Sequence, residues 1–80
     1  MKIAISITDT TAPVSVDIMV NDEQKIETTF NVLEESVPEL SGISNIKKVR
    51  LKENGRIIAT SLTYKEADIY NGADLLLMQN

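Results

Sequence analysis

The sequence predicts an α+β fold, in which a mixed sheet of four to five strands packs on one main helix. Three observations support this prediction. Two segments at the start alternate apolar and polar residues, the next segment has helical spacing, and the rest returns to short alternating segments separated by glycine turns. The chain has 80 residues, of which 42% are hydrophobic. This size predicts one domain over residues 1–80, near the lower limit for a self-sufficient core.

The first two segments are predicted to form a β-hairpin. From Lys2 to Thr8, and again from Val14 to Val20, apolar and mostly β-branched residues occupy every second position, which places them on one face of each strand. Residues 9–13, ending at Pro13, have the composition of a polar turn. The hairpin therefore has one apolar face.

Helical spacing follows the hairpin. Asn21 or Asp22 can cap this helix, and the acidic residues near them suit the positive end of its dipole. Pro38 ends it, because the residue before a proline is pushed out of helical geometry. The stripe predicted to face the core consists of Ile26, Thr29, Phe30, Leu33 and Val37.

A loop and a second hairpin come next. Residues 39–45 predict a loop, which we expect Leu40, Ile43 and Ile46 to hold against the core. After it, Val49 and Leu51 face one side of a strand, and the basic residues between and beside them face the other. The dipeptide at 54–55, Asn-Gly, predicts a type I′ turn with positive φ at both residues, and residues 57–58 continue the next strand.

The last third of the chain predicts a capped turn, a corner and a closing strand. Thr63 and Glu66 have the spacing of a capping box, which predicts one short helical turn through about Ala67. The Asn-Gly pair at 71–72 predicts a left-handed corner. In the closing strand, Leu75 and Leu77 lie on one face, and residues 76 and 78 lie on the other.

These elements follow the β-grasp order of strand, strand, helix, strand, strand, turn and strand. A single helix cannot cover both faces of such a sheet. One face is therefore expected to pack on Ile26, Phe30 and Leu33, while the other stays in solvent.

Composition argues against several classes of function. The chain has no Cys and no His, which removes disulfides, thiolate chemistry and the usual general base. The adjacent pairs Asp22-Glu23 and Glu34-Glu35 do not converge on one point of a helix and are predicted to be a solvated face. Asp68 and Asp74 flank a turn and could hold a cation, but turn chemistry alone explains their presence. We therefore expect no enzyme activity, no cofactor and no metal.

Charge is distributed unevenly along the chain. Residues 1–46 carry two Lys against eight acidic residues, whereas residues 47–56 carry five Lys or Arg against one Glu. A local basic patch on an acidic body favours a protein contact over general nucleic-acid binding. The alternating N-terminus does not have the form of a signal peptide, and no segment is long and apolar enough for a membrane span. A soluble, cytoplasmic protein without direct membrane insertion is expected.

The C-terminal half resembles ubiquitin over about residues 47–78. Asn54-Gly55-Arg56-Ile57-Ile58, Thr63-Tyr64-Lys65-Glu66 and Leu75-Leu76-Leu77-Met78 can be laid on ubiquitin without a gap. The ending Ile69-Tyr70-Asn71-Gly72-Ala73-Asp74-Leu75-Leu76-Leu77 is most similar to the small bacterial YukD/EsaB proteins, although Ala73 interrupts their usual Gly-Asp adjacency. This resemblance implies a ubiquitin-like fold and a cytoplasmic accessory or regulatory role in type VII (ESX-like) secretion.

Other members of the ubiquitin-like superfamily suggest two further functions. The chain could be a small ubiquitin-like subunit of a multicomponent enzyme, such as a bacterial monooxygenase. A conjugated modifier or sulfur carrier is the weaker option, because such proteins end in a flexible Gly-Gly tail and this sequence has no glycine after Gly72. We therefore expect no conjugation through the C-terminus.

The open face of the predicted sheet is the candidate partner-binding site. In the β-grasp order the closing strand pairs beside the basic strand, so two apolar side chains are expected inside a positive rim, near Ala4 and Ser6. The resemblance implies a partner surface here, because ubiquitin uses the same face for most non-covalent recognition. The alternative is that single exposed apolar residues are common and that strand lysines discourage aggregation. The candidate residues are Lys48, Arg50, Lys52, Leu76 and Met78. The expected partners are proteins, including cytoplasmic parts of membrane secretion components, bound by a monomer or weak dimer.

Overall fold

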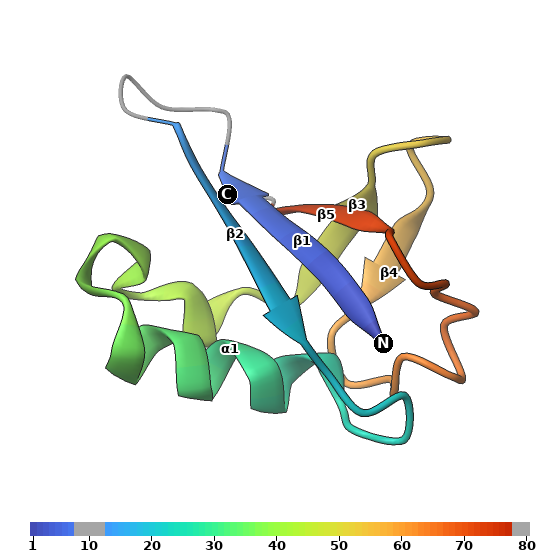
Figure 1. Ribbon diagram of the computed structural model, residues 1–80, viewed down its shortest axis with the longest axis horizontal. Helices are drawn as coiled ribbons and strands as arrows, with labels where there is room; N and C mark the ends of the chain where they lie inside the picture. Colours follow the sequence, from blue (N-terminus) through green and yellow to red (C-terminus); the bar gives the residue numbers. More distant parts are fainter. Residues whose placement is uncertain (8–12, 78–80) are drawn as a thin grey trace.

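The computed structural model describes residues 1–7 and 13–77 of the chain, as five strands, one α-helix and two short 3₁₀ turns (Figure 1). In chain order they are β1 (Lys2–Ile7), β2 (Val14–Met19), α1 (Ile26–Ser36), η1 (Pro38–Leu40), η2 (Ile43–Asn45), β3 (Lys48–Leu51), β4 (Ile57–Ala59) and β5 (Asp74–Leu77). The turn predicted at residues 9–13 and the end of the predicted closing strand at Met78 lie mostly outside the described residues.

The strands form one sheet in the order β2-β1-β5-β3-β4. β5 runs parallel to β1 and antiparallel to β3, while β1–β2 and β3–β4 are antiparallel hairpins. The closing strand therefore lies at the centre of the sheet, between the two hairpins (Figure 1). This mixed sheet with one helix confirms the predicted α+β β-grasp fold.

The core lies between α1 and one face of the sheet. From the helix, Ile26, Phe30 and Leu33 are buried, as the spacing predicts. From the sheet, Leu75 and Val49 are both 0% exposed. Thr29, also in the predicted stripe, is buried as well, and its Oγ1 accepts a hydrogen bond of 2.7 Å from the hydroxyl of Tyr64, which offsets the cost of burying a polar group. Burial raises the pKa of Tyr64 to about 12, so this phenol stays protonated at neutral pH.

The start of the helix differs from the prediction. Neither Asn21 nor Asp22 caps α1; the N-cap is Lys25, which makes no side-chain capping bond. Asn21 instead closes a separate turn, because its Oδ1 accepts from the amide of Glu23 and its carbonyl accepts from Gln24. The first helical amides donate to another part of the chain, Ile26 to the carbonyl of Leu62. A tertiary contact thus replaces the local cap.

The hairpin between β3 and β4 also differs from the prediction. The Asn-Gly pair does not form a type I′ turn, because only Gly55 has positive φ, at 74°. The bonds from Leu51 N–H to the Arg56 carbonyl and from Gly55 N–H to the Leu51 carbonyl enclose a longer loop. The Asn54 side chain accepts from the Arg56 amide, which suits the right-handed conformation.

The segment before β5 agrees with the sequence. Thr63 and Glu66 form the reciprocal capping box, with both bonds at 3.0 Å. The hydrogen bonds that the Glu66 carboxylate accepts from Thr63, above all from its amide, lower the pKa of Glu66. The single turn closes with a bond from Ala67 N–H to the Thr63 carbonyl. Gly72 has φ 90°, as predicted for the corner. Asp68, with φ 59°, is a left-handed residue that the sequence did not reveal.

Candidate interaction surface

The open face of the sheet is the face turned away from α1. Strand pairing brings one residue from each strand into a row across it, since Ser6 is aligned with both Ser15 and Leu76, and Arg50 is aligned with both Leu76 and Ile57. This central row contains Ser15, Ser6, Leu76, Arg50 and Ile57. It changes from polar at the β2 edge to basic and apolar at the β4 edge.

Leu76 and Arg50 are the centre of the predicted patch. Leu76 is half-buried, and it lies between Ser6 and Arg50 in the register. Arg50 is exposed, as is Lys48 two residues earlier on the same face of β3. The structure therefore brings an apolar side chain and two cations together, as the alternation predicts. Leu76 is less exposed than the prediction of a freely exposed side chain implied.

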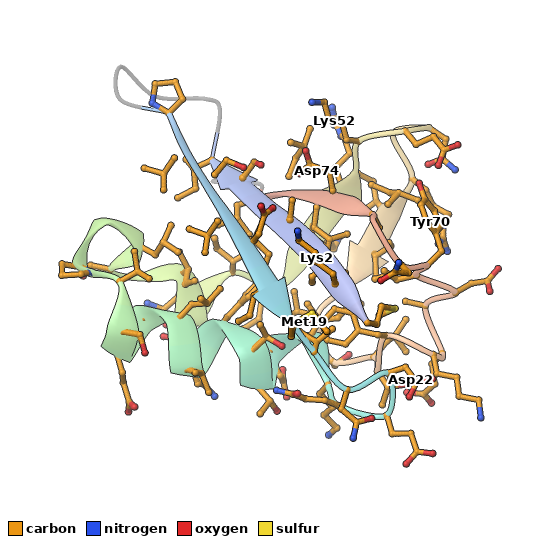
Figure 2. The ribbon with its side chains drawn as sticks, in the orientation of Figure 1. Lys2, Met19, Asp22, Lys52, Tyr70 and Asp74 are labelled. Atoms are coloured by element: carbon orange, nitrogen blue, oxygen red, sulfur yellow. The ribbon has the colours of Figure 1, made fainter. Side chains whose placement is uncertain are left out.

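Lys52 has a different environment from the other two cations. Its Nζ lies 3.7 Å from Oδ2 of Asp74, so its charge is shared with a carboxylate (Figure 2). The other oxygen of Asp74 accepts a hydrogen bond of 3.0 Å from the Ser6 hydroxyl, which also lies 3.0 Å from the Ser15 hydroxyl. These four residues form a polar network that joins β2, β1 and β5 to the first residue after β3. The network separates Lys52 from the positive rim that the sequence predicts.

Sequence reasoning missed two members of the open face. Ile57 is 45% exposed and lies directly opposite Arg50, which adds a second apolar side chain to the patch. The position of Ile57 after the turn predicts a strand. Which face of the sheet Ile57 occupies depends on the geometry of the hairpin, and the sequence predicted that geometry incorrectly. The sequence analysis explained Asp74 by turn chemistry and did not place it on this face. Met78, the remaining candidate, lies outside the described residues.

A tyrosine at the end of the sheet interacts with the β3–β4 loop. The Tyr70 hydroxyl donates to the carboxylate of Glu53, and this bond raises the pKa of Tyr70. Tyr70 is itself 42% exposed. The contact links the segment before β5 to the basic hairpin (Figure 2).

The described residues contain neither a cluster of metal ligands nor a membrane-spanning helix. Over residues 1–7 and 13–77, no group of three acidic side chains is arranged to hold a metal ion. Within the same ranges, no helix is long and apolar enough to cross a membrane. The carboxylate of Asp74 already accepts a hydrogen bond from Ser6 and pairs with Lys52. Held in this way, it can make polar contacts with a partner.

The order of the elements and the mixed sheet make the fold ubiquitin-like in architecture. A ubiquitin-like protein from the hyperthermophilic archaeon Caldiarchaeum subterraneum is similar in structure, with a TM-score of 0.52. The match covers 100% of this chain and 96% of that one, at 16% sequence identity. Comparison with known families and with curated proteins gave no match. The structural likeness at this identity shows the fold alone.

Proposed function

We propose that this protein is a non-catalytic interaction module that binds a protein partner through the open face of its sheet. The observation that carries the proposal is the position of Leu76, half-buried at the centre of the face that no helix covers, beside Arg50 and with Ile57 beyond it. An apolar centre with a charged rim has the composition of small protein interfaces. Lys48 extends the positive rim of this patch.

The specific role we propose is that of a cytoplasmic accessory or regulator of type VII secretion. The support for it is the resemblance of residues 69–77 to the YukD/EsaB ending. The corresponding partners are cytoplasmic parts of membrane-anchored secretion components. A basic rim of this kind favours an acidic partner surface.

A pull-down from native lysate tests both levels of the proposal. The baits are the wild-type protein, a Leu76→Asp variant and a Lys48→Glu/Arg50→Glu variant, each checked for cooperative melting. A Lys25→Glu/Lys65→Glu variant is the matched control, because it makes the same change of net charge at two exposed lysines elsewhere. The expected result is that secretion components bind the wild type and the control and are lost from both open-face variants.

The outcomes separate the general proposal from the specific one. Recovery of oxygenase subunits in the same pattern would support the open face and reject the secretion role in favour of the enzyme-subunit alternative. Partners that survive both open-face variants would reject the open face itself. Gene neighbourhood gives an independent check, because an FtsK/SpoIIIE-type ATPase and WXG-motif proteins are expected near a type VII accessory.

A further inference from the structure

The outer edge of β2 presents unpaired backbone groups. Val20 donates its amide to the Met1 carbonyl and accepts from the Met1 amino group, so this pair is of the hydrogen-bonded kind. Hydrogen-bonded and non-bonded pairs alternate along an antiparallel ladder. Ile18 and Val16 therefore bond to β1, while the N–H and C=O groups of Ser15, Asp17 and Met19 point away from the sheet.

These outward groups have no backbone partner in the part of the chain that the structure describes. The opposite edge of the sheet is different. β4 has only three residues, and one of its outward carbonyls, that of Ala59, already accepts from the amide of Leu62. Of the two edges, β2 is thus the longer and the more open, with six residues against the three of β4.

Side chains along β2 also fit an added strand. On the open-face side, Asp17 is exposed and Met19 is 71% exposed, the largest value among the large hydrophobic residues described. On the helix side, Val16 and Ile18 are only half-buried, although they pack against the core. An added strand would cover apolar surface on both of its faces, and flexible Met side chains are common at binding surfaces.

The helix contributes one further apolar side chain on this side. Glu34 lies on the flank of α1 that faces η2, because its carboxylate accepts from the Ser44 amide. Val32 is two residues earlier, about 160° around the helix from Glu34, and it is 50% exposed. Since η2 leads into β3, at the far side of the sheet from β2, the flank with Val32 is the one turned toward β2.

We propose that the β2 edge binds an extended segment of a protein partner as a sixth strand, with a Lys or Arg beside Asp17 and an apolar residue beside Met19. Charge favours this occupant, because Asp17, the acidic side chain on β2, is exposed and forms no ion pair with the other described residues. A second copy of this chain fits less well. Antiparallel pairing of two β2 strands centred on Asp17 places the two carboxylates directly opposite each other, which is destabilising.

The test uses a displayed library of random eight-residue peptides selected on the wild-type protein. Selected peptides are expected to carry a basic residue among alternating apolar ones. Their affinity should fall about tenfold for Asp17→Lys, which places like charges in contact, and change less than about twofold for the matched control Asp22→Lys. Leu76→Asp should leave the affinity unchanged, which keeps this surface separate from the open-face patch.

Amide hydrogen exchange measured by NMR identifies strand addition directly. With a selected peptide bound, the amides of Ser15, Asp17 and Met19 are expected to exchange at least tenfold more slowly, while those of Val16 and Ile18, already bonded to β1, change little. The proposal is overturned if the library yields no binder, or if bound peptides leave those three amides unprotected. Protection that rises with protein concentration in the absence of peptide would also overturn it, because a second copy would then be the occupant.

Discussion

The two faces of β5 show how one strand separates stability from recognition. Leu75 is 0% exposed against α1, whereas Leu76, the next residue, is half-buried on the open face beside Arg50. The residue type is the same and the strand is the same. Only the phase of the strand differs, since successive side chains point to opposite faces. Substitutions on the two faces should therefore have very different effects.

The largest expected effect comes from placing a charge on the helix-covered face. Leu75→Asp buries an unpaired carboxylate at the centre of the sheet, at a cost of several kcal/mol. A domain of this size has a total stability on the order of 5 kcal/mol, so we expect the variant to be unfolded. Leu76→Asp loses half-exposed apolar contacts worth about 1 kcal/mol and should remain folded beside Arg50. Thermal melting followed by circular dichroism measures both.

This pair of variants is its own control, because the same substitution is made at adjacent positions. Cooperative melting in Leu76→Asp but not in Leu75→Asp would support the division between the two faces. Equal loss of cooperativity in both variants would contradict it, and it would remove Leu76→Asp as a tool for testing partner binding.

Sequence reasoning described the fold well where the signal is local and repeated. The alternation in β1, β2, β3 and β5 defined which residues face the core, and the capping box at Thr63 and Glu66 appears with both of its bonds. Sequence reasoning failed where a distant segment supplies the hydrogen bonds that a local residue was expected to supply. The first turn of α1 donates to the carbonyls of Leu62 and Thr60, so the helix starts at Ile26 and not directly after Asn21 or Asp22. No pattern near residue 21 contains that information.

The sequence predicted which residues lie on the candidate surface, but not the contacts that their side chains make with neighbouring strands. Period-2 alternation placed Lys48, Arg50 and Leu76 on one face. The sequence could not show that Asp74 would lie within reach of both Ser6 and Lys52, because these residues come from two strands and a loop far apart in the chain. The β3–β4 loop also depends on its complete bonding pattern, which the Asn-Gly pair alone did not specify.

A smaller effect is expected from the polar contact inside the core. Tyr64→Phe removes the hydrogen bond to Thr29, which is worth about 1 kcal/mol. The phenol has a pKa of about 12 in the folded protein, against about 10 in the unfolded chain. A raised folded-state pKa gives stability that is complete below pH 10 and is lost as the pH rises toward 12. Denaturant unfolding across this range should show a steeper alkaline decline for the wild type than for Tyr64→Phe.

Tyr70→Phe is the comparison for this measurement. Tyr70 also has a raised pKa, but it is exposed, and its partner Glu53 lies on the surface loop. We expect its substitution to change the alkaline decline less than substitution of Tyr64 does. Parallel curves for the wild type and Tyr64→Phe above pH 10 would contradict the inference that the buried phenol controls this behaviour.

The smallest effect is expected for the ion pair on the open face. The Lys52 side chain is 66% exposed and its Nζ lies 3.7 Å from Asp74, so Lys52→Ala should cost less than about 0.5 kcal/mol. A double-mutant cycle with Asp74→Asn isolates the pair from the bond that Asp74 also accepts from Ser6. The coupling should vanish in about 1 M salt, where charges are screened within about 3 Å. A coupling free energy well above 1 kcal/mol would mean that side chains on the open face also stabilise the fold. A weak pair would instead leave Lys52 free to exchange Asp74 for a partner's carboxylate at little cost to the fold.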